Sequence, residues 1–224
     1  MKLVVVCLLV ACGGATKPAP EPEHQHGTHH GAGGMPHRFE NAAQWAKVFD
    51  DPARDAWQQP DRVIAALELS PTLTIADVGA GTGYFAVKLA PLAKEVIATD
   101  IEEDMVRYMK ERGEREGIKN LRAVLTPKDD PQLARVDRIL VVDVWHHLGD
   151  RKAYAKKLAA ALNQGGFVAV VDFKLEATMG PPKQHRLPPA AIIEDLQAAG
   201  LDAKVALELE QQYVVIGRLR SAGT

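Results

Sequence analysis

The fold class is decided by the stretch Ile75-Ala76-Asp77-Val78-Gly79-Ala80-Gly81-Thr82-Gly83-Tyr84-Phe85. A short apolar run ends at Val78, three glycines then recur at every second position, and a second apolar run begins at Tyr84. Glycine adopts positive φ and lets a ligand come close to the backbone. The pattern predicts a buried strand, a tight glycine turn and a helix. The turn then lies at the carboxyl end of its strand, where open α/β sheets bind ligands.

Outward from this stretch, apolar runs typical of strands alternate with runs that have helical spacing. We expect strands at 74–78, 95–99, 121–125, 136–142 and 167–172. We expect helices at 84–92, 103–116, 151–162 and 189–200. This alternation predicts a parallel sheet with helices on both faces. The last two apolar runs, 203–210 and 212–219, have no helix between them and predict a closing antiparallel hairpin.

Helical spacing also precedes the glycine stretch, over residues 39–49 and 61–69. Between them, Asp51 is expected to cap a further helix with Pro52 at its first position. We therefore divide the folded part into an N-terminal helical lid, 37–70, and a ligand-binding domain, 71–219. The lid residues expected to face the ligand are Arg54, Trp57 and Gln58, although plain packing is the alternative for Trp57.

A second acidic cue stands at Asp100, directly after the strand Val96-Ile97-Ala98-Thr99. A carboxylate at this strand tip can accept both hydroxyls of a ribose. The alternative role is a helix N-cap, since a charged helix begins soon after. The segment from Gly81 to Ala86 also fits the dinucleotide pattern, so an NAD-dependent oxidoreductase stays open. Asp77 before the loop and the terminal hairpin count against it.

The segment from Asp77 to Gly83 resembles motif I of class I S-adenosylmethionine (SAM)-dependent methyltransferases, and Asp100 resembles the acidic residue of their second strand. The similarity runs from about Asp61 to Leu219. It implies an α/β, Rossmann-like, seven-stranded and mostly parallel sheet with helices on both faces and a C-terminal antiparallel hairpin. It also implies an enzyme that transfers a methyl group, with SAM as cofactor.

The resemblance assigns a role to each part of this region. In that family the glycine backbone lies against the methionine part of SAM, the acid of strand two holds the ribose, and the residues after it flank the adenine. An acidic residue after strand three often meets the adenine amino group, for which we take Asp129 over Asp130. The implied cofactor-binding set is Asp77, Gly79, Ala80, Gly81, Gly83, Asp100, Ile101, Met105, Asp129 and Asp143.

The segment from Asp143 to His147 resembles the fourth-strand loop of methyltransferases that act on small molecules. The resemblance places this loop beside the methyl group and Asp143 against the methionine amino group. His146 or His147 could act as a base, because imidazole titrates near neutral pH. The alternative is that one packs in the loop while the other bonds backbone. The loop from Lys174 to Leu187 is expected to shape the acceptor site.

The N-terminus has the layout of an export signal, with Lys2 before an apolar run from Leu3 to Ala11. The run is too short for a membrane-spanning helix, which needs about 20 residues. Leu9-Val10-Ala11-Cys12 resembles a bacterial lipobox. The resemblance implies a signal peptide at 1–11, a lipid on Cys12 and a periplasm-facing anchor in the cell envelope. The alternatives are a buried strand, or a start at Met35 and a cytoplasmic enzyme.

Residues 12–36 are rich in His, Gly and Pro and predict a disordered tether. Its histidines His24, His26, His29 and His30, with His37 just beyond, could bind a metal weakly. The two cysteines, Cys7 and Cys12, leave the body without a thiolate metal site or a disulfide. A formal net charge of -2 argues against nucleic acid as partner. Export away from cytoplasmic SAM keeps open a binding module without turnover.

Overall fold

The computed structural model describes residues 41–220. The predicted signal peptide, Cys12, the tether and Met35 lie outside these residues. Within them, no helix is long and apolar enough to cross a membrane.

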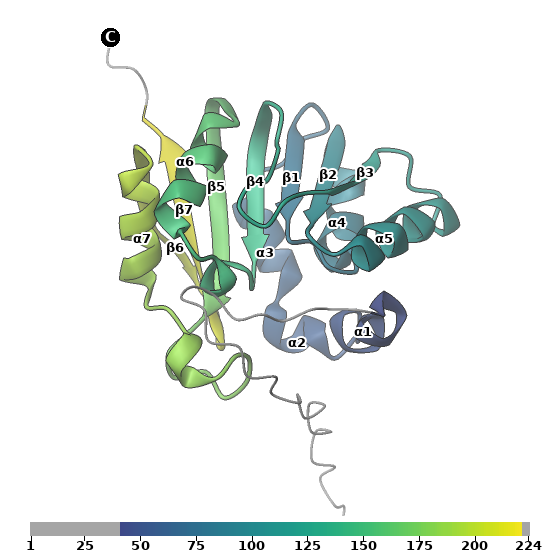
Figure 1. Cartoon of the computed structure of the whole chain (residues 1–224), viewed down its shortest axis with the longest axis horizontal. Helices are drawn as coiled ribbons and strands as arrows, with labels where there is room; N and C mark the ends of the chain where they lie inside the picture. Colours follow the sequence, from purple (N-terminus) through teal and green to yellow (C-terminus); the bar gives the residue numbers. More distant parts are fainter. Residues whose placement is uncertain (1–40, 221–224) are drawn as a thin grey trace, which may run out of the picture. The chain divides into compact units, whose positions relative to one another are not determined.

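A single seven-stranded sheet forms the centre of the described part, in the order β3-β2-β1-β4-β5-β7-β6 (Figure 1). Neighbouring strands from β3 to β5 pair in parallel, whereas β7 runs antiparallel to both β5 and β6. This arrangement confirms the predicted fold class, including the terminal hairpin. The strands are β1 (Thr74–Val78), β2 (Glu95–Asp100), β3 (Leu121–Leu125), β4 (Val136–Val142), β5 (Leu162–Phe173), β6 (Leu201–Glu208) and β7 (Gln212–Leu219).

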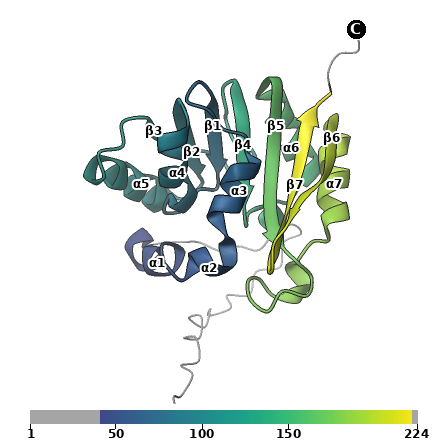
Figure 2. The ribbon, with the colours of Figure 1, turned by 180° about the vertical axis from the view of Figure 1, so that it is seen from behind.

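Helices cover both faces of the sheet, as the two opposite views show (Figures 1 and 2). The α-helices are α1 (Ala42–Phe49), α2 (Arg54–Gln58), α3 (Pro60–Ala66), α4 (Tyr84–Leu89), α5 (Glu103–Arg115), α6 (Arg151–Ala160) and α7 (Pro189–Ala198). Three short 3-10 helices join them: η1 (Ala90–Leu92), η2 (Trp145–His147) and η3 (Lys183–His185).

Two hydrophobic cores result, because successive residues of a strand point to opposite faces. In β4, Ile139 packs in the core under α6 and α7, while its neighbour Leu140 packs in the core under α3, α4 and α5. Both side chains are fully buried. The carboxyl ends of β1, β2, β4 and β5 therefore emerge together at one edge of a rigid, doubly covered sheet.

Two predicted helix boundaries differ from the structure because of backbone chemistry. The helix expected at 84–92 ends at Leu89 and continues as η1, which contains Pro91; proline lacks the N–H that an α-helix interior needs. The helix expected after Pro52 begins at Arg54 instead. Asp51 caps the preceding turn, where its Oδ1 accepts a 2.8 Å hydrogen bond from the Ala53 N–H.

The fifth strand begins earlier than predicted. Residues 151–162 were expected to be helical, but α6 ends at Ala160 and β5 starts at Leu162. Its pairing with β4 shifts register between Val136 and Arg138. Such an irregularity accommodates Gly165 and Gly166 inside the strand, where the sequence had suggested that they only lead into it.

Candidate active site

The glycine loop leaves β1 and is tied to the neighbouring strand β2. The N–H groups of Gly79 and Ala80 both donate to the Thr99 carbonyl, at 2.8 and 2.9 Å. Gly79 has φ +72°, and a Cβ there would lie 2.4 Å from Cγ2 of Val144. The loop after β4 thus packs directly on the glycine loop, which explains why this position takes only glycine.

Asp100 ends β2 and holds the glycine loop from the other side. Its Oδ2 accepts from the Gly81 N–H at 2.8 Å and its Oδ1 from the Glu102 N–H at 2.9 Å. The N-cap position of α5 belongs to Glu102, so Asp100 is not that cap. Burial raises the pKa of Asp100, and these backbone donors oppose the shift. An ionised carboxylate has about four acceptor sites, and three backbone N–H groups, those of Gly81, Ile101 and Glu102, act on this one, so it can still accept from a further donor.

The residues predicted to surround the adenine differ in exposure. Ile101 is 48% exposed at the tip of β2, whereas Met105 is fully buried in the first turn of α5. After β3, the Asp130 carboxylate binds Lys157 Nζ at 3.1 Å and the Gln132 N–H at 2.9 Å. Asp129 offers Lys157 only its backbone carbonyl. The carboxylate of Asp129 is therefore the one that these contacts leave available.

Two further acidic residues lie at the ends of β1 and β4: Asp77, which is buried, and Asp143, whose side chain is 22% exposed. Oδ2 of Asp77 has no hydrogen-bond partner within residues 41–220. Burial raises the pKa of each carboxyl group to about 7, and the charge of Arg54 opposes this in both. Asp143 has φ +58° and accepts from Gln212 Nε2 at 2.5 Å. The edge thus holds one buried and one partly buried carboxyl group, and Arg54 is the positive charge that acts on both.

Arg54 of α2 is the cation that faces these acids. Its Nη2 lies 3.8 Å from Oδ2 of Asp143, and its guanidinium stacks 4.1 Å from the Tyr84 ring centroid. Nε and Nη2 also donate to Oε1 of Gln58, at 3.1 and 3.0 Å. Gln58 in turn donates to Gln212, so one buried polar network joins α2 to β7 and Asp143. The predicted lid residues Arg54 and Gln58 are therefore brought to the site.

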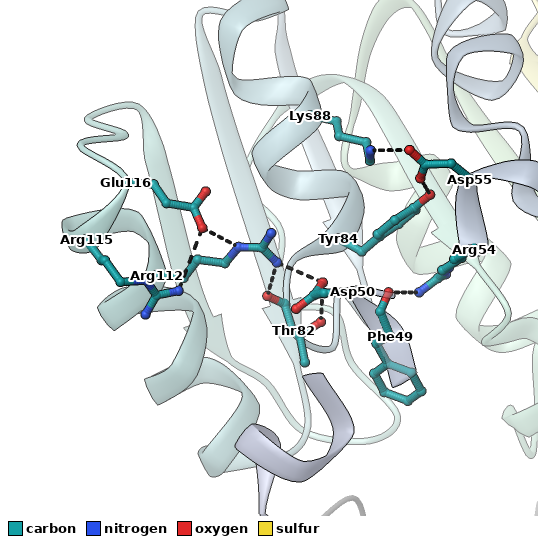
Figure 3. Close-up of polar contacts among 10 residues, drawn as sticks. All are labelled: Phe49, Asp50, Arg54, Asp55, Thr82, Tyr84, Lys88, Arg112, Arg115 and Glu116. Atoms are coloured by element: carbon teal, nitrogen blue, oxygen red, sulfur yellow. Dashed lines mark hydrogen bonds and ion pairs between the residues drawn. The ribbon is translucent and has the colours of Figure 1, made fainter. Parts of the chain in front are cut away.

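The N-terminal helices, which the sequence predicts to form a lid, are also fastened to the glycine loop through Asp50, which follows α1 (Figure 3). Its Oδ1 accepts from Thr82 Oγ1 at 3.0 Å and from Arg112 Nη1 at 2.9 Å. Arg112 donates as well to the Thr82 carbonyl at 3.2 Å. A second tie joins Asp55 of α2 to the Tyr84 hydroxyl and to Lys88. These contacts hold α1 and α2 over the turn.

His146 lies in η2, just after Asp143, and meets Asp172 of β5. Its Nδ1 is 2.9 and 3.1 Å from the two Asp172 oxygens, and the side chains are only 3% and 0% exposed. Burial by itself would lower the pKa of His146, but the bond and charge of Asp172, helped by Asp143, raise it above the ordinary value. The His147 ring lies against that of His146, with centroids 4.2 Å apart.

The loop from Lys174 to Leu187 continues from β5 and is internally braced. Arg186 donates to four backbone carbonyls of this loop, those of Leu175, Ala177, Met179 and Pro181. Gly180 packs on the ring of Phe173, and Trp57 stacks on the same ring with centroids 5.8 Å apart. Trp57 therefore packs between the lid and the loop, which is the alternative that the sequence left open for it.

Sequence reasoning missed two residues of this edge, Asp172 and Gln212. Asp172 had a usable signal, because it closes a buried apolar strand as Asp100 does. Gln212 had none, since it meets Asp143 from 69 residues away. The predicted residues Asp77, Gly79, Asp100 and Asp143 do converge at one edge of the sheet.

Known proteins match the centre of this chain. Residues 76–168 match the family model described as a methyltransferase domain. The tRNA 5-carboxymethoxyuridine methyltransferase of Escherichia coli K12 is 29% identical over 120 residues, which are 51% of this chain and 45% of that protein. A probable ribosomal RNA small subunit methyltransferase A of Methanosarcina mazei is 42% identical over 52 residues, 23% of this chain and 19% of that protein. The chain thus spans less than half the length of either relative.

The fold is shared with solved structures. A SAM-dependent methyltransferase from Aquifex aeolicus superimposes with a TM-score of 0.73 at 24% identity, covering 80% of this chain and 99% of that one. A TehB-like SAM-dependent methyltransferase from Corynebacterium glutamicum gives 0.62 at 16% identity, covering 80% and 98%. The family model thus matches residues 76–168, and the two solved structures show that the chain shares their fold.

Proposed function

We propose that this protein transfers a methyl group from SAM to a small-molecule acceptor at the edge formed by β1, β2, β4 and β5. The observation that supports it best is the buried, unpartnered Oδ2 of Asp77, beside the glycine loop of a methyltransferase domain. A buried polar atom without a partner is rare in a folded protein and needs an explanation. A cationic ligand at this edge supplies one.

The residues present fit SAM. Asp77 and Asp143 would face its cationic methionine end, because a nearby positive charge favours the ionised form of these two carboxyl groups, whose pKa is raised to about 7. Asp100 would accept the ribose hydroxyls through its remaining acceptor capacity. Ile101 presents an exposed apolar side chain to flank the adenine, and Asp129 a carboxylate for its amino group. The backbone of Gly79, Ala80, Gly81 and Gly83 would lie along the methionine.

SAM supplies an already activated methyl group, so the protein has mainly to align the reactants and exclude water. The lid supports that task. Helices α1 and α2 are fastened over the glycine turn through Asp50 and Asp55, and Arg54 offsets the charge of Asp77 and Asp143.

A small acceptor is favoured over RNA by charge. The chain has a formal net charge of -2, and binding to a phosphate backbone depends on Lys and Arg contacts. The test incubates the full chain with methyl-labelled SAM and a cell extract split into RNA, protein and low-mass fractions. We expect label in the low-mass fraction. Label in the RNA fraction would contradict the proposed acceptor, though not methyl transfer.

Isothermal titration with SAM, S-adenosylhomocysteine and NAD tests the cofactor. We expect the first two to bind and NAD not to bind. Binding of NAD alone would overturn the proposal in favour of an oxidoreductase. Binding of SAM with no labelled acceptor in any fraction would favour a binding module without turnover.

We also propose that the mature protein is anchored in the cell envelope through a lipid on Cys12, which lies outside the described residues. The support is the order of charge, apolar run and cysteine at the N-terminus. Expression from Met1 with labelled palmitate should label the wild type and Cys7→Ala but not Cys12→Ala. An unlabelled wild type would refute the anchor.

A further inference from the structure

We propose that His146 is the general base of this site, that Asp172 is its positioning residue, and that the acceptor is therefore a hydroxyl or thiol compound whose attacked atom arrives protonated. The inference rests on the proposed methyl transfer and adds to it the chemical class of the acceptor.

The geometry of the pair carries the assignment. Both Asp172 oxygens lie within 3.1 Å of Nδ1 of His146, and Asp172 also accepts from the Phe173 N–H at 2.8 Å. An ionised carboxylate only accepts hydrogen bonds, so Nδ1 carries the proton. Both contacts with Asp172 involve Nδ1 and neither involves Nε2 of His146. That nitrogen is the one able to receive a proton, with the ring held in place from behind.

The position of the pair connects it to the cofactor edge. The Asp143 N–H donates to the Val171 carbonyl at 3.0 Å, which joins the tip of β4 to β5 one residue before Asp172. Val144, which precedes η2, packs on Gly79 of the glycine loop. His146 thus follows directly after a segment that contains Asp143, a proposed cofactor ligand, and that packs on the glycine loop through Val144.

A base is needed only when the nucleophile carries a proton. As the acceptor's oxygen or sulfur bonds to the methyl carbon, its proton moves to Nε2 of His146. The electron pair of the breaking carbon–sulfur bond stays on the departing thioether, so charge and atoms balance. Asp172 stabilises the imidazolium that forms, as a buried carboxylate does behind the histidine of a serine-protease triad. An acceptor with a free lone pair and no proton would need neither residue.

Other charged groups surround the pair and define its pH behaviour. Asp172 faces His146 from β5, Asp143 from the tip of β4 and His147 from η2 itself. Arg54 of the lid and Tyr213 of β7 lie next, one against Asp143 and the other against Asp172. Two carboxylates thus act directly on His146 and favour its protonated form. Transfer should then rise with pH to a plateau, with a midpoint above the ordinary histidine pKa of about 6.5.

The competing explanation is that the pair only braces η2, and a neighbouring pair offers a matched control. Asp195 of α7 is 3% exposed and holds the same turn through Trp145 Nε1 at 3.1 Å and Arg151 Nε at 2.7 Å. Asp195→Asn therefore changes a buried carboxylate of α7 that binds Trp145 of η2 and Arg151 of α6, and it leaves the His146–Asp172 contact in place. A purely structural role for Asp172 predicts similar behaviour of Asp172→Asn and Asp195→Asn.

The first experiment needs no acceptor. Nuclear magnetic resonance of the full chain with labelled histidine follows the imidazole titrations, with His146 assigned by its loss in His146→Gln. We expect the His146 pKa to fall in Asp172→Asn and to stay in place in Asp195→Asn. An unchanged pKa in Asp172→Asn would overturn the positioning role.

The second experiment identifies the product. The full chain, SAM with a deuterated methyl group and a low-mass metabolite extract are incubated, and the new methyl group is located by mass spectrometry. We expect an O-methyl or S-methyl product. His146→Gln should lower kcat about 10²–10⁴-fold with little change in KM, and Asp172→Asn should move the acidic limb of the pH profile to lower pH.

Outcomes for this inference and for the proposed function can be told apart. Methylation of an unprotonated nitrogen or of a metalloid, or wild-type kcat in His146→Gln, would overturn the base while leaving methyl transfer intact. A wild-type chain that does not bind SAM in titration would overturn the proposed function itself, whatever the His146 titration shows.

Discussion

The acidic residues at the two ends of the sheet differ in how completely their oxygens are hydrogen-bonded. At the amino end, Asp137 of β4 is satisfied, since its oxygens accept from the Thr74 N–H at 2.8 Å and from Asn163 Nδ2 at 2.9 Å. At the carboxyl end, Asp77 keeps an oxygen without a partner and its pKa is raised to about 7. A buried oxygen without a partner, as in Asp77, does not stabilise the fold. The contrast indicates that the amino end is built for stability and the carboxyl end for a ligand.

Asp77→Asn should give the largest effect. We expect SAM affinity to fall about 100-fold, because the variant removes a buried negative charge that faces the cofactor, and hydrogen bonds to charged groups contribute about 1.5–3 kcal/mol. The ligand-free variant should be no less stable than the wild type above pH 7, since a buried charge disappears. Titration calorimetry and thermal melts measure both quantities.

Asp137→Asn is the matched control at the other end of the sheet. It should lose about 1–3 kcal/mol of unfolding free energy, because its two donors lose their ionised acceptor, and it should keep the wild-type SAM affinity. If the two variants behaved alike, the division of the sheet into a stabilising end and a binding end would fail.

Gly79→Ala should destabilise the fold by about 1–3 kcal/mol. The position combines φ +72° with a Cβ that would meet Val144 at 2.4 Å. Gly165→Ala separates the two causes, since Gly165 has φ +76° but nothing within 4 Å of a Cβ. Denaturant unfolding should show the smaller loss at Gly165. Equal losses would mean that backbone conformation, not contact with the β4 loop, governs Gly79.

The pH dependence of SAM binding gives a smaller effect of definite sign. The folded protein keeps a proton on Asp77 up to about pH 7, whereas the unfolded chain releases it near 3.8. The stability from this group is thus complete below 3.8 and is lost as pH rises through about 7. A cationic ligand favours the ionised form, so SAM should bind roughly tenfold tighter at about pH 8 than at about pH 6. The dependence should weaken in Asp77→Asn, where Asp143 alone still titrates near pH 7, and a flat wild-type profile would contradict it.

Lys88→Met should give the smallest effect. Lys88 pairs with Asp55 at 3.3 Å, but the two side chains are 31% and 50% exposed. Exposed pairs contribute about 0–1 kcal/mol, so we expect unfolding free energy and SAM affinity to stay within about 0.5 kcal/mol of the wild type. A large loss of SAM affinity would show that this surface tie, and not the buried edge, holds the lid.

The sequence was sufficient for what local patterns encode. The glycine loop, Asp100 and the alternation of apolar runs predicted the sheet, its hairpin and the edge that gathers the acids. Contacts between residues that lie far apart in the sequence could not be predicted from such patterns. Gln212 reaches Asp143 from a mostly apolar strand, and the Gln58–Gln212 bond spans 154 residues. The early start of β5 could not be predicted either, because the register shift beside Gly165 and Gly166 interrupts the alternation of residues that marks a strand in the sequence.

The contact between Gly79 and Val144 has a consequence for the order of events at the site. Close-packed interiors transmit displacement, because they have little free space to absorb it. Val144 immediately precedes the turn that contains His146, so a ligand that shifts the glycine loop also shifts that turn. Such coupling is reciprocal: if the bound cofactor changes the affinity for the acceptor by some factor, the bound acceptor changes the affinity for the cofactor by the same factor.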